Sequence, residues 1–134
     1  MAAELQVLAL SALLWVALLL VTAIGVNRQL GPSYLMGPRD APPAPLEGTA
    51  ARLKRAFDNH TEGLVPFTAA VVVVHLADAA SVFTAACAWA YLAARVLYVP
   101  AYALGWTPGR SLIWGVGFAA TALLLLLGLI ATLG

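Results

Sequence analysis

Residues 55–62 read RAFDNHTE, and this polar run opens a stretch that is otherwise apolar as far as Ala77. Within the run, Arg55, Asn59 and Glu62 are spaced i, i+4 and i+7, so a helix of about 3.6 residues per turn carries all three on one face. Charge is costly inside a membrane helix and usually faces a partner, a cavity or a ligand. The run therefore predicts a membrane helix with one functional polar face.

A second polar set lies in the next apolar stretch. Arg95, Tyr98 and Tyr102 are spaced i, i+3 and i+7, again on one helical face. If the two stretches run antiparallel, Glu62 and Arg95 lie at similar depths, and an ion pair between them would lower the cost of both charges. Such a pair would set helix register, whereas the two tyrosines indicate a ligand pocket between the faces.

The composition is that of a membrane protein. Of 134 residues, 63% are hydrophobic and 10% are charged, whereas soluble domains carry about 25% charged residues. The net charge of +1 points to no nucleic-acid partner, and no metal-ligand cluster is visible. The single cysteine, Cys87, excludes an intrachain disulfide and is expected to be a buried, inert thiol.

Four apolar stretches approach the roughly 20 residues that cross a bilayer; they cover approximately residues 5–26, 56–77, 79–104 and 112–133. The predicted fold is an all-α membrane protein, a four-helix bundle forming one domain over residues 1–134. The first stretch is long and has no Lys or Arg before it, so it is expected to be a membrane helix and not a cleaved signal peptide.

The three connections differ in length and composition. Residues 27–54 contain GPRDAPPAP at positions 37–45, and this proline density favours an extended path. Residues 78–81 make a tight antiparallel hairpin, and GWTPG at 105–109 is a turn signal.

Charge asymmetry sets the predicted orientation. The basic residues that lie in or beside the first and third connections are Arg28, Arg39, Arg52, Lys54, Arg55 and Arg110. The second connection contains Asp78 and no Lys or Arg. The positive-inside rule then places loops one and three in the cytoplasm and both termini on the opposite side.

Other polar residues have simpler interpretations. Asp58 and His60 are expected to lie at the membrane interface and cap the second helix, and His75 with Asp78 to lie at helix ends near the other face. Arginines outnumber deep acids at the cytoplasmic end, which favours a small ligand with carboxylate groups. Nearby positive charge also lowers the pKa of a thiol and so raises its reactivity.

The combined pattern resembles the MAPEG family, the membrane-associated proteins of eicosanoid and glutathione metabolism. The resemblance rests on Arg55-x-x-x-Asn59-x-x-Glu62, on Arg95-x-x-Tyr98-x-x-x-Tyr102 and on Arg110-Ser111. The GPRD segment at 37–40 is similar to bacterial members.

The resemblance implies a homotrimer that binds glutathione between subunits near the cytoplasmic side. It assigns thiol activation to Arg110, and glutathione contacts to Arg28 (from the adjacent subunit), Arg55, Asn59, Glu62, Arg95, Tyr98, Tyr102 and Ser111.

The predicted function is that of an integral membrane glutathione-dependent enzyme, of the microsomal transferase or peroxidase type, acting on a lipophilic electrophile from the bilayer. A non-catalytic lipid-binding or scaffold protein on the same fold is the alternative. A small exporter that exchanges protons for cations at Glu62 is a third possibility, but the neighbouring arginines would repel cations.

Overall fold

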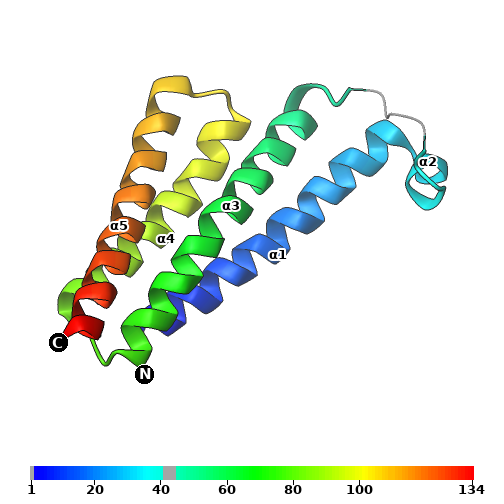
Figure 1. The fold of residues 1–134 in the computed structure, drawn as a ribbon. Coiled ribbons are helices and arrows are strands. Elements are labelled where there is room, and N and C mark those ends of the chain that lie inside the picture. Colours follow the sequence, from blue (N-terminus) through cyan, green and yellow to red (C-terminus); the bar gives the residue numbers. More distant parts are fainter. Residues whose placement is uncertain (1, 41–44) are drawn as a thin grey trace.

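The computed structural model describes residues 2–40 and 45–134 and is entirely helical in regular structure there. Its helices are α1 (Ala3–Leu30), α2 (Pro32–Met36), α3 (Gly48–Leu76), α4 (Val82–Ala103) and α5 (Thr107–Leu133). The four long helices lie side by side, both termini are at one end, and α2 lies at the other (Figure 1). This arrangement confirms the predicted all-helical fold.

Three of the long helices, α1, α3 and α5, begin earlier than the apolar stretches predicted, whereas α4 (Val82–Ala103) lies within the predicted range 79–104. α1 continues to Leu30, where Gly31 adopts a φ of 84° that favours glycine and ends the helix. Pro32 then starts α2, a short helix before the proline-rich segment that the sequence analysis did not predict. α3 begins at Gly48, before the predicted start at residue 56, so the polar run 55–62 lies inside the helix. The prolines at 42 and 43 lie outside the described residues.

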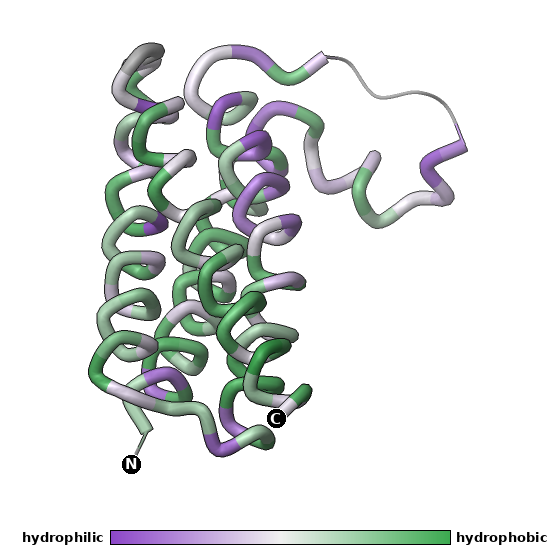
Figure 2. Tube along the Cα trace, turned by 60° about the vertical axis from the view of Figure 1, so that its left-hand side comes forward, coloured by the Kyte–Doolittle hydropathy of each residue, from purple (hydrophilic) through white to green (hydrophobic). Residues whose placement is uncertain are grey.

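Three of the described helices are long and apolar enough to cross a membrane, namely α1, α4 and residues 109–133 of α5. They indicate a multi-pass membrane protein. α3, predicted as a fourth span, is not among them, because its first half carries the RAFDNHTE run. Figure 2 shows the hydrophilic residues gathered toward the end of the bundle where α2 lies.

The core lies between the long helices in the half of the bundle nearer the termini. Phe67 of α3 and Tyr91 of α4 stack with their ring centroids 3.8 Å apart, and Val7 and Leu124 are fully buried beside them. Cys87 is buried in the same cluster, as the sequence predicted. Leucines and valines cover much of the outer surface, as expected for helices in lipid.

The hairpin between α3 and α4 is closed by side-chain caps. The Ser81 side chain accepts from the Thr84 amide while the Thr84 hydroxyl accepts from the Ser81 amide, which forms a capping box. The Thr84 hydroxyl also contacts the buried carboxylate of Glu4. These bonds hold the start of α1 against α4 and fix the antiparallel pair that positions the polar faces.

Candidate functional site

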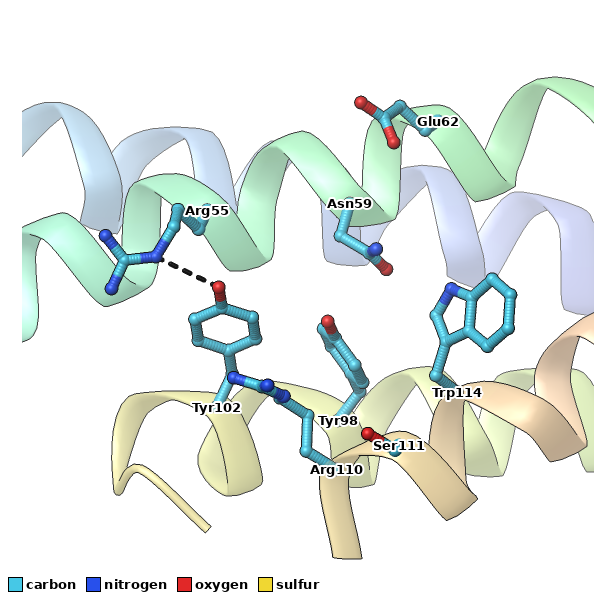
Figure 3. Close-up of a pocket in the computed structure, with 8 residues that line it drawn as sticks. All are labelled: Arg55, Asn59, Glu62, Tyr98, Tyr102, Arg110, Ser111 and Trp114. Atoms are coloured by element: carbon cyan, nitrogen blue, oxygen red, sulfur yellow. Dashed lines mark hydrogen bonds between the residues drawn. The ribbon is translucent and has the colours of Figure 1, made fainter. Parts of the chain in front are cut away.

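A polar cavity of about 390 Å³ opens between α3, α4 and α5 in the polar half of the bundle. Its lining comes from all three helices: Arg55, Asn59 and Glu62 of α3, Tyr98 and Tyr102 of α4, and Arg110, Ser111 and Trp114 of α5 (Figure 3). The two polar faces predicted from spacing therefore meet in one pocket. The first turns of α5 complete it, because the short connection after Ala103 brings Arg110 beside the end of α4.

Tyr102 organises the two arginines at the mouth of this cavity. The Nε atom of Arg55 donates a hydrogen bond to the Tyr102 hydroxyl at 2.9 Å. The guanidinium carbon of Arg110 lies 4.6 Å from the centroid of the Tyr102 ring, and that of Arg55 lies 5.6 Å from it. Both distances suit cation–π attraction. One phenol thus holds two positive charges close together.

Neither of these charges forms an ion pair with an acidic side chain among the residues that the structure describes. Across residues 2–40 and 45–134 the single ion pair joins Lys54 to Asp58, at 2.7 Å and at the exposed end of α3. Glu62 also lines the cavity but is exposed, as is Arg55. The cavity is therefore rich in unneutralised guanidinium donors, an arrangement that suits carboxylate and thiolate groups.

Arg95 is buried, unlike Arg55. The Glu62–Arg95 ion pair expected from the sequence is wrong. Only 4% of Arg95 is exposed, and its Nη1 atom donates to the Asn59 Oδ1 atom at 2.9 Å. Asn59 is the α3 residue that faces α4, whereas Glu62 points to the outside of the single chain. Equal depth in the two helices was predicted, but depth does not determine rotation about the helix axis.

A second cavity, of about 450 Å³, adjoins the first. The two linings share Asn59, Glu62 and Trp114. Arg95 lines this second cavity and is absent from the lining of the first. The remaining lining is mostly apolar and comes from Pro66, Phe118 and Leu125, among others. The two cavities are therefore neighbours that share a wall.

Trp114 is a site residue that the sequence analysis missed. It lines both cavities and stacks on Phe118 with ring centroids 5.3 Å apart. Its position four residues after Arg110 places it one turn further along the same face of α5. That spacing is the signal that would have identified it.

Two residues considered in the sequence analysis, His60 and Arg28, line neither cavity. His60 is 1% exposed, and its Nε2 atom lies 3.0 Å from the carbonyl oxygen of Ser11 on α1, so the expected interfacial position is wrong. The turn of α3 that points Asn59 at α4 points His60 at α1. Arg28 is exposed at the end of α1 and lines neither cavity within one chain. Its contribution to a neighbouring subunit stays a prediction.

The fold and the cavities define a multi-pass helical membrane protein with an arginine-lined polar cavity beside an apolar one. The MAPEG family matches residues 5–130, which is nearly the whole chain, and the protein belongs to this family. MAPEG proteins are membrane glutathione-related enzymes. None of the curated proteins and none of the solved structures compared matches the chain.

Proposed function

We propose that the protein is an integral membrane enzyme that activates glutathione and transfers its sulfur to a lipophilic electrophile, or uses it to reduce a peroxide. The observation that carries this proposal is that Arg55 and Arg110 both lie around Tyr102 and form no ion pair with a carboxylate of residues 2–40 and 45–134. Glutathione supplies both of the missing partners, since it carries two carboxylates and an ionisable thiol. Family membership supports the same ligand.

The roles follow from the chemistry of each group. Arg55 would bind a carboxylate of the peptide, and Glu62 its amino group. Arg110 would stabilise the thiolate, because a nearby guanidinium lowers the pKa of a thiol. The hydroxyls of Tyr98, Tyr102 and Ser111 would donate to the ligand. Asn59, held by Arg95 at 2.9 Å, would present its amide to the peptide.

The reaction begins with loss of the thiol proton. In conjugation, the thiolate forms a carbon–sulfur bond and the leaving group departs with the electron pair. In peroxide reduction, it attacks one oxygen, the oxygen–oxygen bond breaks, and the alkoxide takes a proton; a second glutathione then forms the disulfide and releases water. Both routes need the same thiolate, so Arg110 serves either.

A homotrimer would complete the site. Arg55, Glu62 and Ser111 are exposed in a single chain although they lie on helices in a membrane protein. Charged groups facing lipid are costly, so a neighbouring subunit that covers this face would lower the cost. Arg28 of that neighbour is the side chain expected to reach the ligand.

The proposed orientation has the polar end of the bundle in the cytoplasm. The connection between α1 and α3 and that between α4 and α5 both lie at this end, and the termini lie at the other (Figure 1). The first connection and its edges carry the basic residues Arg28, Arg39, Arg52 and Lys54. The positive-inside rule favours a cytoplasmic location for such a segment. Water-soluble glutathione would then enter from the cytoplasm.

A non-catalytic lipid-binding protein is the second candidate, and the apolar cavity favours it. The test is conjugation of glutathione to chlorodinitrobenzene by the purified protein, together with the ultraviolet absorbance of thiolate on mixing protein with glutathione. Turnover above the uncatalysed rate and a thiolate signal at neutral pH are expected. Glutathione binding without either signal would favour the lipid-binding candidate.

A further inference from the structure

Arg52 is a charged side chain of α3 that lies outside the site described above. It is exposed and lines neither cavity. Its Nη1 atom donates a hydrogen bond to the carbonyl oxygen of Ala103, the last residue of α4, at 3.3 Å. The last carbonyls of a helix have no partner within it and carry partial negative charge, so a guanidinium from a neighbouring helix stabilises this end. Arg52 therefore ties α3 to the end of α4.

The same guanidinium packs on the turn that follows α4. A Cβ atom at Gly105 would lie 3.6 Å from the Arg52 Cζ atom and 3.8 Å from each of its Nη atoms. Gly105 has a φ of 73°, which favours glycine, and its amide donates to the Tyr102 carbonyl at 3.0 Å. Because Gly105 has no side chain, the flat guanidinium lies directly against the backbone of this turn.

The turn leads to Arg110 through a short run of contacts. Residues 104–106 alone separate α4 from α5. The Trp106 amide donates to the Ala101 carbonyl at 2.8 Å, and the Trp106 carbonyl accepts from the Arg110 amide at 3.1 Å. The Trp106 ring also packs on Gly109, where a Cβ atom would lie 2.9 Å from the Cε2 atom. A shift of the end of α4 would therefore move the backbone of Arg110.

Two arginines of α3, one turn apart, hold adjacent residues of α4. Arg55 bonds the Tyr102 hydroxyl at the polar cavity, whereas Arg52 bonds the Ala103 carbonyl outside it. The guanidinium carbon of Arg110 lies 4.6 Å from the centroid of the Tyr102 ring. Both α3 arginines thus act where Arg110 meets α4, but only Arg55 lines the cavity.

We propose that Arg52 is a positioning residue for Arg110: it fixes the end of α4 and the turn after it, and this turn holds the Arg110 guanidinium at the cavity. The inference rests on the proposed function, which gives Arg110 the role of stabilising the thiolate. Arg52 itself does not touch the ligand. Its loss should change the reactivity of bound glutathione and leave the affinity nearly unchanged, because the carboxylate contact of Arg55 remains.

The test compares Arg52→Gln with the wild type, as full-length proteins in phosphatidylcholine nanodiscs. Thiolate absorbance is titrated with pH, and glutathione affinity is measured by isothermal titration. Arg52→Gln should raise the pKa of the bound thiol, because a displaced guanidinium stabilises the thiolate less. Turnover of chlorodinitrobenzene should fall by about three- to tenfold, with affinity within about twofold of the wild type. Arg52→Lys should recover most of the loss, since its ammonium keeps a charged donor.

Two further variants separate position from charge. Lys54→Gln removes a positive charge two residues away, from an exposed ion pair, and should behave as the wild type does. Arg52→Gln is also made in the Arg110→Ala background. If Arg52 acts through Arg110, it has no effect on the thiol there, whereas a direct effect of its charge would persist. Because Arg52 is exposed, these variants should fold, and thermal unfolding checks this.

The outcomes separate this inference from the proposed function. The inference is overturned if Arg52→Gln keeps the wild-type thiol pKa and turnover, if Lys54→Gln changes both equally, or if the effect of Arg52→Gln is the same without Arg110. A parallel loss of glutathione affinity would also overturn it, because Arg52 would then support binding. In each of these cases the glutathione proposal stands. If the wild type shows neither thiolate nor turnover, the proposed function fails, and this inference fails with it.

Discussion

The polar and apolar cavities lie on the same three helices and share a wall, yet the arginines that line them have opposite environments. In the polar cavity, Arg55 and Arg110 are grouped around Tyr102 and remain within reach of water. In the apolar cavity, Arg95 is buried with one amide as its hydrogen-bond partner. The difference teaches that a deep arginine takes its partners from the chain, here Asn59 and the rings of Tyr91 and Tyr98, whereas the shallow arginines stay within reach of water or a ligand.

The largest effect is expected from Arg110→Ala. Removing the guanidinium takes away the stabilisation of the thiolate, and loss of one such electrostatic group costs about 10²- to 10³-fold in turnover. Glutathione affinity should fall much less, since the carboxylate contacts remain. Stopped-flow thiolate absorbance and chlorodinitrobenzene turnover measure the two quantities. Wild-type turnover in this variant would remove Arg110 from the mechanism.

Arg55→Ala should weaken glutathione binding by about 10- to 100-fold, the range for a lost charged hydrogen bond. Isothermal titration with glutathione measures it. Lys54→Ala is the matched control, because Lys54 is the adjacent residue, and its exposed pair with Asp58 should contribute little. Equal losses in both variants would mean that Arg55 acts through general surface charge.

Asn59→Ala tests the link between the cavities. It removes the hydrogen-bond acceptor of Arg95, and leaving a buried donor unsatisfied costs about 1–3 kcal/mol. Thermal unfolding in detergent should show the loss. Asn27→Ala, at an exposed position near the end of α1, is the control. Unchanged stability without ligand would show that Arg95 needs no partner.

The smallest effect is expected from Tyr102→Phe. This change keeps the ring beneath Arg110 but removes the hydroxyl that accepts from Arg55, a loss of about 0.5–1.5 kcal/mol. Glutathione affinity should fall by a few-fold. Tyr102→Leu removes the ring as well and should fall further, because the cation–π contact is then lost too. If both variants bind equally, the ring has no role in holding the arginines.

Much of the polar cavity could be predicted because its residues repeat at helical spacing. Arg55, Asn59 and Glu62, with Tyr98 and Tyr102, mark two faces whose meeting needs only an antiparallel pair. The apolar cavity could not be predicted in this way. Phe118, Ala122 and Leu125 look like any other apolar residues in a membrane helix, and only the packing of α5 against α3 leaves a space between them.

The sequence by itself determined the helical membrane class, the family and the residues of the polar face, because composition and spacing along one chain encode them directly. Only the tertiary structure decided that Arg95 bonds Asn59 and not Glu62, and that His60 turns toward α1. The physical reason is that these pairings depend on the rotation and separation of whole helices. Those quantities result from packing among all of them, and no local pattern specifies them.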